Sequence, residues 1–216
     1  KISEEWLDRI LNANEISNTR AWTYSKNNHN FYLFTVGNET YCYDVMTGEW
    51  HIRSSRNYYT SKNKPYMPLY AVWFNNKIIT GCCENGNLYI LDDDYYCEDF
   101  DAEHSLPLYR VRQTPVITAD YKPFVLYQLN LECNVGAIEN YGKLSKALLQ
   151  VSQDGGMTFG NVIEGSLGER GQYSTRLSWL NLGRMRQAVL KVMFSENSDF
   201  VISDASLRFD ILNTPI

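Results

Sequence analysis

In one short stretch, SQDGGMTF at 152–159, a serine, an aspartate and a threonine lie close together at regular spacing. Side chains of these types can take part in catalysis, so this stretch is the first candidate for a functional site. Its S-x-D-x-G-x-T-F spacing is formed by Ser152, Asp154, Gly156, Thr158 and Phe159. An aspartate in this position accepts hydrogen bonds from backbone N–H groups across a turn, and paired glycines supply the positive φ of a tight hairpin. The pattern therefore predicts a locked hairpin, with Thr158 bonded back to Asp154 and Phe159 plugging the core beneath.

This spacing resembles the Asp box of sialidases, in which the motif recurs several times away from the active site. Here it occurs once, so we interpret it as structural and assign no catalytic residue. A sialidase scheme also needs three clustered arginines and a tyrosine nucleophile with an acid partner. The arginines closest in sequence are expected on solvated or subunit-facing surface: Arg170, Arg176, Arg184 and Arg186. The alternative function, a carbohydrate-binding or sialidase-like propeller protein, stays open.

No metal or cofactor site is predicted. Seven carboxylates between Asp92 and Glu103 could ligate calcium, yet the run lacks the spacing and central glycine of a calcium loop. We interpret it as a solvated linker or a negative lip. The histidines show no metal-ligand spacing, and the sequence holds no phosphate loop or dinucleotide fingerprint. These histidines are His29, His51 and His104.

Composition limits the function classes. The formal charge of −5 argues against a protein whose task is to grip nucleic-acid phosphates. Five cysteines without regular spacing fit a reducing compartment better than a disulfide scaffold. No apolar run approaches the length of a membrane span, so no membrane partner is expected. The chain opens at Lys1 without Met, and we expect it to be a piece of a longer protein.

The elements that would position these residues are mostly strands. Residues 3–12 predict one short helix, with Ser3 as its N-cap and an apolar stripe that includes Trp6 and Ile10. Residues 125–135 alternate with a period of two, which predicts Val125, Tyr127, Leu129 and Leu131 on one buried face and Leu126 out of phase. Residues 206–211 predict a second such strand, with an inward face of Leu207, Phe209 and Ile211.

Two hairpins in the first half repeat one plan, at 31–50 and 77–96, with an offset of about 48 to 51 residues. Ala21-Trp22 and Val72-Trp73 lie upstream of them. This offset is typical of a four-stranded propeller blade. Because two blades cannot close a propeller, either further blades precede Lys1 or the repeat is a coincidence of two hairpins.

The predicted fold is all-β: a partial β-propeller of about two blades followed by a β-sandwich-like domain, with one short N-terminal helix. We place the propeller-blade region and the helix at residues 1–112. The sandwich-like domain, which carries the Asp-box hairpin, is placed at residues 113–216, because blade spacing is lost after Pro115.

The C-terminal stretch resembles the packaged-DNA stabilisation proteins of short-tailed bacteriophages, also called tail accessory factors or nozzle hubs. The family shows S-x-DGG-x-TW, then IG-x-x-G-x-Y-x-TR, then W-x-x-LG-x-x-R. Phe159 departs from the family's tryptophan. The second and third motifs correspond to Leu167, Gly168, Gly171, Tyr173, Thr175 and Arg176, and to Trp179, Leu182, Gly183 and Arg186. Family-like segments also occur at 21–34, 85–92 and 110–117.

The resemblance implies a structural virion protein of the phage tail, assembled in the host cytoplasm, and not an enzyme. Such proteins form a homo-oligomeric ring, usually a hexamer, below the portal and its adaptor. They close the DNA channel with a needle or plug, retain packaged DNA and carry tailspikes or fibres. A net negative chain would let DNA pass without sequence-specific binding.

Overall fold

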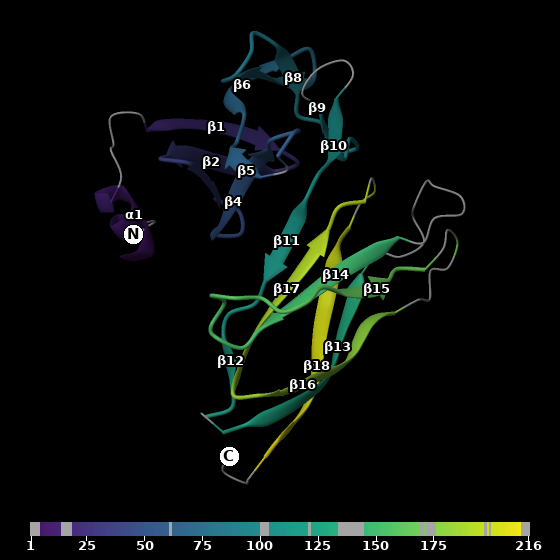
Figure 1. Ribbon diagram of the computed structural model, residues 1–216. Coiled ribbons are helices and arrows are strands. Elements are labelled where there is room, and N and C mark those ends of the chain that lie inside the picture. Colours follow the sequence, from purple (N-terminus) through teal and green to yellow (C-terminus); the bar gives the residue numbers. More distant parts are fainter. Residues whose placement is uncertain are drawn as a thin grey trace. The chain divides into compact units, whose positions relative to one another are not determined.

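Strands account for almost all regular structure in the computed structural model, which confirms the all-β prediction (Figure 1). The chain divides into two compact units, Lys1–Asp93 with Glu98–Leu106, and Asp94–Cys97 with Pro107–Ile216. The residues that the structure describes are 5–13, 19–60, 62–99, 104–120, 122–133, 145–168, 171, 176–196, 198 and 200–212.

The first unit contains two blades of a propeller. The first blade is an antiparallel sheet of five strands, joined in chain order. The second blade has three strands, also in chain order. The first comprises β1 (Arg20–Lys26), β2 (His29–Val36), β3 (Glu39–Asp44), β4 (Glu49–Arg56) and β5 (Asn63–Pro65). The second comprises β6 (Pro68–Phe74), β7 (Lys77–Cys82) and β8 (Leu88–Ile90).

Matching two-residue turns open both blades. Asn27-Asn28 joins β1 to β2, and Asn75-Asn76 joins β6 to β7, all four with positive φ. Positive φ at both central residues is the type I′ geometry that suits the twist of a hairpin, and Asn tolerates it better than most residues. The two turns lie about 48 residues apart, so they fix the offset of the blade repeat at the lower end of the predicted range.

The alignment of the two turns shows that Trp22 and Trp73 do not occupy equivalent positions in the two blades, although the sequence pattern had paired them. Trp22 is buried in the first blade, whereas Trp73 is 62% exposed. Counted from the asparagine turns, Trp22 corresponds to Tyr70, and Trp73 corresponds to Ser25. The paired Ala-Trp and Val-Trp dipeptides were therefore a misleading signal, because they lie at different distances from their turns.

Each face of the first blade has its own cover. Trp22, Leu33 and Cys42 form a buried cluster that packs against Ala71 and Leu91 at the second blade. On the opposite face Phe34, Val36 and Tyr41 form a second cluster. That cluster packs against Ile10 and Leu11 of the single described helix, α1 (Glu5–Ala13). The predicted N-cap, Ser3, lies outside the described residues.

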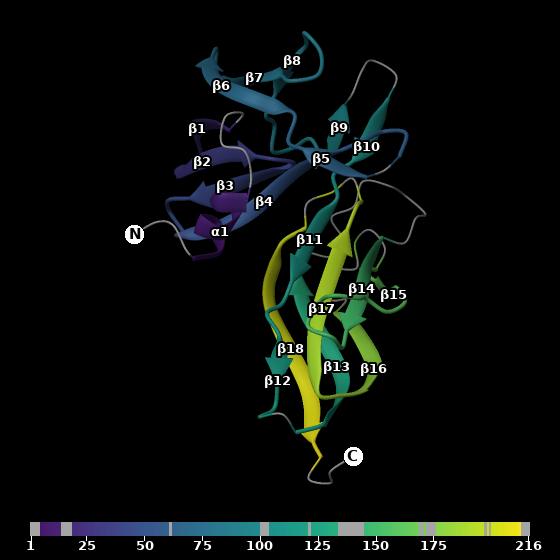
Figure 2. The ribbon, with the colours of Figure 1, turned by 60° about the vertical axis from the view of Figure 1, so that its left-hand side comes forward.

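The chain leaves the first unit through a small two-stranded sheet of β9 (Cys97–Asp99) and β10 (Ser105–Pro107). The second unit is a β-sandwich (Figure 2). One sheet has the order β16-β13-β18; the other has the order β11-β17-β14-β15, with β12 also pairing β17. Its strands are β11 (Arg110–Gln113), β12 (Ile117–Thr118), β13 (Phe124–Cys133), β14 (Lys146–Ser152), β15 (Ile163–Ser166), β16 (Leu177–Met185), β17 (Gln187–Phe194) and β18 (Ile202–Ile211).

A bulge in β13 overturns part of the predicted alternation. Phe124 and Leu126 are buried together with Leu129 and Leu131, while Tyr127 is 39% exposed. The pairing register shifts between Leu126 and Gln128 on both neighbouring strands. An extra residue at a bulge changes which face the following side chains take. Leu126 is therefore in phase with the core, and Tyr127 is the residue that breaks the period.

Arg110 fastens the start of the sandwich. Its guanidinium donates to the carbonyl oxygens of Glu196 and Ser198, at 2.9 and 2.6 Å. The same group lies over the rings of Phe194 and Tyr96, 4.7 and 5.4 Å from their centroids. Arg110 thus ties the first residue of β11 to the connection between β17 and β18.

Gly165 allows β15 to approach the centre of the sandwich core. A Cβ atom on Gly165 would lie 2.6 Å from Leu177 Cδ1 and 2.7 Å from Trp179 Cε2. Both of those side chains are fully buried, and Trp179 Nε1 donates to the carbonyl oxygen of Ile163 at 3.1 Å. The indole can therefore fill the core and still pair its N–H, provided that position 165 has no side chain.

We predict that Gly165→Ala destabilises the second unit by about 1–3 kcal/mol, since the added methyl overpacks a filled core. Urea unfolding followed by Trp fluorescence measures this change. Glu164→Ala is the matched control on the same strand; it removes only the exposed pair with Lys146, and we expect a change within about 0.5 kcal/mol. Equal stability of the Gly165→Ala variant and the unmodified protein would contradict the close approach.

Candidate functional site

The 152–159 turn is closed by its own side chains. Ser152 Oγ donates to Asp154 Oδ1 at 2.6 Å and accepts from the backbone N–H of Gly156 at 2.9 Å. Thr158 donates to the Asp154 carboxylate from its backbone N–H at 2.9 Å and from its hydroxyl at 2.5 Å. Gly155 and Gly156 both have positive φ. The carboxylate is therefore occupied by donors from within the turn.

These donors also hold Asp154 ionised. The hydrogen bond from Ser152, followed by those from Thr158, lowers the pKa of the Asp154 carboxyl far below its usual value. A general acid in a glycosidase needs the opposite change, a raised pKa. The turn is thus suited to hold a backbone shape and unsuited to deliver a proton.

Phe159 differs from its predicted role as a plug of the core. It is only half-buried, and Lys191 Nζ lies over its ring at 4.0 Å. The hairpin is also wider than a tight turn, because β14 pairs with β15 only as far as Leu149 and Ile163. The intervening loop approaches the side of β17 that bears Val189 and Lys191: a Cβ on Gly156 would lie 4.0 Å from Val189. The loop and its phenyl ring therefore lie against the outer face of that sheet.

The arginines do not assemble a carboxylate clamp. Arg176 lies at the start of β16 and approaches Glu132 at 3.5 Å, both side chains being well exposed. Arg184 and Arg186 lie at the far end of that strand, where with Gln153 and Met185 they line a shallow cavity of about 410 Å³. A strand rises about 3.3 Å per residue, so Arg176 and Arg184 are far too distant to share one ligand. Arg170 lies outside the described residues.

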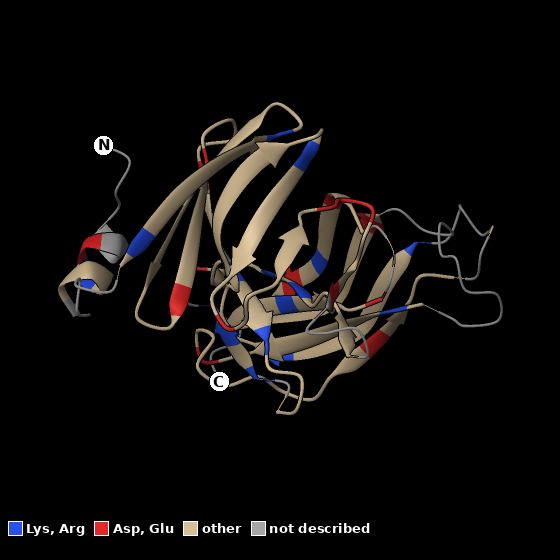
Figure 3. Ribbon diagram, turned by 90° about the horizontal axis from the view of Figure 1, so that it is seen from above, with Lys and Arg blue, Asp and Glu red and all other residues tan. Residues whose placement is uncertain are grey.

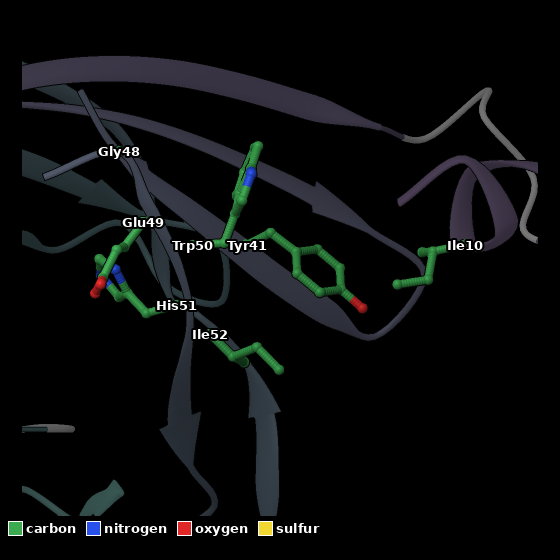
Figure 4. A pocket seen from close by; sticks show the side chains of 7 residues that line it. All are labelled: Ile10, Tyr41, Gly48, Glu49, Trp50, His51 and Ile52. Atoms are coloured by element: carbon green, nitrogen blue, oxygen red, sulfur yellow. The ribbon is translucent and has the colours of Figure 1, made fainter. Parts of the chain in front are cut away.

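A cavity of about 560 Å³ lies against the first blade and α1 (Figure 4). It is lined by Ile10, Tyr41, Gly48, Glu49, Trp50, His51 and Ile52. Tyr41 donates its hydroxyl to the Glu39 carboxylate, which is the tyrosine–acid pairing a sialidase would use. However, burial and then this hydrogen bond raise the pKa of Tyr41 well above its ordinary value. A sialidase site also needs an arginine clamp for the substrate carboxylate, and none of the residues that line this cavity is an arginine.

The histidines and acidic residues take structural partners. His29 Nδ1 is 2.7 Å from Asp44 Oδ2, and the other Asp44 oxygen accepts from the backbone N–H of Met46. Asp93 pairs with Lys26 at 2.8 Å, and Glu98 accepts from the backbone N–H of Arg56 at 3.0 Å. Within the run interpreted as a solvated linker or a negative lip, Asp92, Asp93 and Asp94 are exposed, whereas Glu98 is half-buried and anchored. Among the described residues no cluster of His, Cys, Asp and Glu fits a metal ion; Asp101 and Glu103 lie outside them.

Sequence reasoning missed one half-buried cation. Arg53 lies over the rings of Tyr24 and Phe31, 5.4 and 5.0 Å from their centroids, and donates to the Tyr24 hydroxyl at 2.5 Å. Burial raises the pKa of Tyr24 to about 12, so this phenol remains neutral. The aromatic rings stabilise the cation within the blade. Alternation along β4, which puts Arg53 on the face of Trp22 and Leu33, was the available signal.

The remaining family-motif residues are structural where they are described. Leu167 and Trp179 are buried in the sandwich core. Gly168, Gly171 and Gly183 all have positive φ, which side chains disfavour. Tyr173 and Thr175 lie outside the described residues. All five cysteines, each of them in the described part, have free thiols.

These features define a class of protein: one with propeller blades and a β-sandwich, in which the described polar side chains form hydrogen bonds that stabilise turns and sheets. The chain belongs to the bacteriophage P22 Gp10 family. Residues 1–96 match the family model described as "Bacteriophage P22 Gp10, beta-propeller", and residues 109–210 match "Bacteriophage P22 Gp10, beta-sandwich". It is therefore a phage structural protein of the tail accessory type. The comparison with curated proteins found no match.

We predict that Thr158→Val raises the pKa of the Asp154 carboxyl, because it removes a hydroxyl that donates to the ionised form. A lowered pKa contributes stability above the unfolded value of about 3.9, and this contribution is lost as pH falls through the folded pKa. Carboxyl carbon NMR between pH 7 and pH 2 follows the titration.

Thr158→Ser is the control variant, since it keeps the hydroxyl donor. Its Asp154 titration should overlay that of the unmodified protein, while the valine variant begins to protonate at higher pH. Identical curves for all three proteins would contradict a hydrogen bond from the Thr158 hydroxyl to the ionised carboxylate.

Proposed function

We propose that this protein forms part of the ring that closes the tail channel below the portal and its adaptor. In this role it retains packaged DNA and anchors the needle or plug and the tailspikes or fibres. The observation that carries the proposal is the match of both P22 Gp10 family models, in order, along one chain. Assembly in the host cytoplasm is part of the same proposal.

The described chemistry supports a structural role and not an enzymatic one. Asp154, the group that most resembles a catalytic acid, has a pKa displaced away from that role, and none of the residues that line the cavity beside Tyr41 is an arginine. The arginines that could hold a substrate carboxylate lie at opposite ends of β16. Within the described residues no helix is long and apolar enough to cross a membrane.

Exposed aromatic side chains support protein contacts. Tyr59 is 85% exposed and lies edge-on to Tyr58, which in turn contacts His104 with ring centroids 4.6 Å apart. Asn57 fixes the turn that bears both tyrosines by accepting from the backbone N–H groups of Tyr59 and Thr60. Rigid tyrosines of this kind are enriched at protein interfaces, since they lose little conformational entropy on binding.

Charge supports passage of DNA without capture. The chain carries a net charge of −5, and basic and acidic positions are interspersed along the strands of each unit (Figure 3). Tight binding to a phosphate backbone needs several Lys or Arg contacts on one surface. Mixed charge with a negative sum instead leaves a duplex free to slide.

We predict that the protein binds its phage's portal–adaptor complex and there forms a hexameric ring. Size-exclusion chromatography with light scattering, run with and without that complex, measures the mass. A ring is expected to use heterologous contacts, because head-to-tail interfaces close into cyclic assemblies. A protein that stays monomeric beside the adaptor and cleaves a sialoside would establish the alternative function instead.

We also predict no retardation of double-stranded DNA in a mobility-shift assay at about 50 mM salt, a concentration that favours electrostatic binding. A basic phage portal-region protein or histone serves as the positive control. Binding that weakens steeply with salt would contradict passive passage.

A further inference from the structure

Strand β18 is a long edge strand of the sandwich (Figure 2). It spans Ile202–Ile211, and among the described strands only β13 pairs with it. In the part of the chain that the structure describes, the backbone N–H and C=O groups along its other side therefore have no strand partner. An edge of this kind is a template for a further strand unless something on it blocks the pairing.

The start of this edge is blocked, whereas its second half is open. The pairing register with β13 shifts between Ile202 and Asp204, which leaves Ser203 as an extra residue. Asp204 Oδ1 accepts from the backbone N–H of Ala205 at 2.8 Å. A bulge and a side chain that occupies an edge group both hinder pairing with another strand. Neither feature occurs on Leu207–Ile211, a segment that the structure describes throughout.

The two faces of this open segment differ in polarity. Phe209 and Ile211 lie on the core side, paired with buried residues of β13, yet they are 44% and 47% exposed. Arg208 and Asp210 lie on the outer side, where both are exposed and neither forms an ion pair with another described residue. A strand that pairs with this edge must therefore present apolar side chains inward and complementary charges outward.

The segment meets this requirement when it pairs with a second copy of itself. Read in either direction, its sequence LRFDI alternates apolar and charged residues. In an antiparallel pair centred on Phe209, Arg208 of each copy lies opposite Asp210 of the other. Leu207 lies opposite Ile211, and the two phenyl rings meet at the centre. Opposite side chains have Cβ atoms about 4.5–5.5 Å apart, close enough for ion pairs and apolar contacts.

Other symmetric registers fit less well. Centred on Leu207, the pair would put Asp204 opposite Asp210 twice. Centred on Arg208, it would put two guanidinium groups together, and like charges directly opposite one another are destabilising. Centred on Ser206, it would pair opposite charges but would also use the blocked start of the edge. The charges and the block together therefore select the first register.

We propose that two copies of this chain associate through β18, in the antiparallel register centred on Phe209. Their three-stranded sheets then form one continuous sheet across a two-fold axis. The contact is isologous, whereas the ring proposed above uses head-to-tail contacts, so the pairing does not depend on ring formation. It removes from water the apolar side chains that β18 exposes on its core side.

Charge exchange tests the pairing. Arg208→Asp makes both outer positions acidic and Asp210→Arg makes both basic, so either variant alone would put like charges opposite each other twice. We expect the dimer dissociation constant of each variant to rise at least about 10-fold above that of the unmodified chain. Sedimentation equilibrium over a range of concentrations measures this constant, and circular dichroism checks that each variant is folded.

Two combinations restore the opposite charges. An equimolar mixture of the two single variants should form mixed dimers, because an acidic strand then lies beside a basic one. The double variant Arg208→Asp/Asp210→Arg should pair with itself about as well as the unmodified chain. Arg184→Asp, at the other edge of the same sheet, and Asp204→Arg, before the paired segment, are matched controls. They make the same charge changes and should alter the constant by less than about 2-fold.

Several outcomes would overturn the inference. An unmodified chain that stays monomeric at every concentration would do so, as would single variants that dimerise normally or fail to form mixed dimers. Weaker pairing of Asp204→Arg would assign the contact to the register centred on Ser206. The proposed ring is measured by binding to the portal–adaptor complex, so its failure and the failure of this pairing are distinguishable.

Discussion

Water drives the apolar face of a sheet against a second layer, and this constraint organises both the sandwich and the first blade. In the sandwich that layer is another sheet, and Trp179 fills the space between them. In the first blade it is the second blade on one side and α1 on the other. The loop after β14 serves the same purpose locally, where its residues lie against Val189 and Lys191. In each of these places a different element removes an apolar sheet face from water.

The all-β class, the two blades and the sandwich could be predicted, because the period of two and the repeated hairpin plan are visible in the sequence. It was harder to predict which side chains of a strand face the core. The bulge at Tyr127 shifts β13 without any glycine or proline to mark it, so alternation alone assigned Val125 and Leu126 to the wrong faces. The Trp dipeptides misled for a related reason: similar letters at unequal distance from a turn do not occupy equivalent positions. The domain boundary after residue 112 stays a prediction.

The sequence identified the candidate polar residues correctly. What these residues contact, however, depended on neighbours that the sequence does not specify. The hydrogen bonds of Asp154 follow from the spacing of the turn itself, so local reasoning was sufficient. The distance between Arg176 and Arg184 depends on β16 being one extended strand. Phe159 is held from outside by Lys191, a residue of β17 that no local pattern connects to it. Contacts between distant strands were thus the part beyond reach of the sequence.

The course of the chain through the sandwich has a mechanical consequence. The linker enters at Arg110, opposite Phe194, while β18 ends at Ile211, opposite Phe124 at the other extremity of the strands. Tension between these points runs parallel to the strands. It loads the β11–β17 and β13–β18 pairings in shear, so the backbone hydrogen bonds of a pairing would break together instead of in succession. A sandwich threaded in this way is loaded in shear at both of these points.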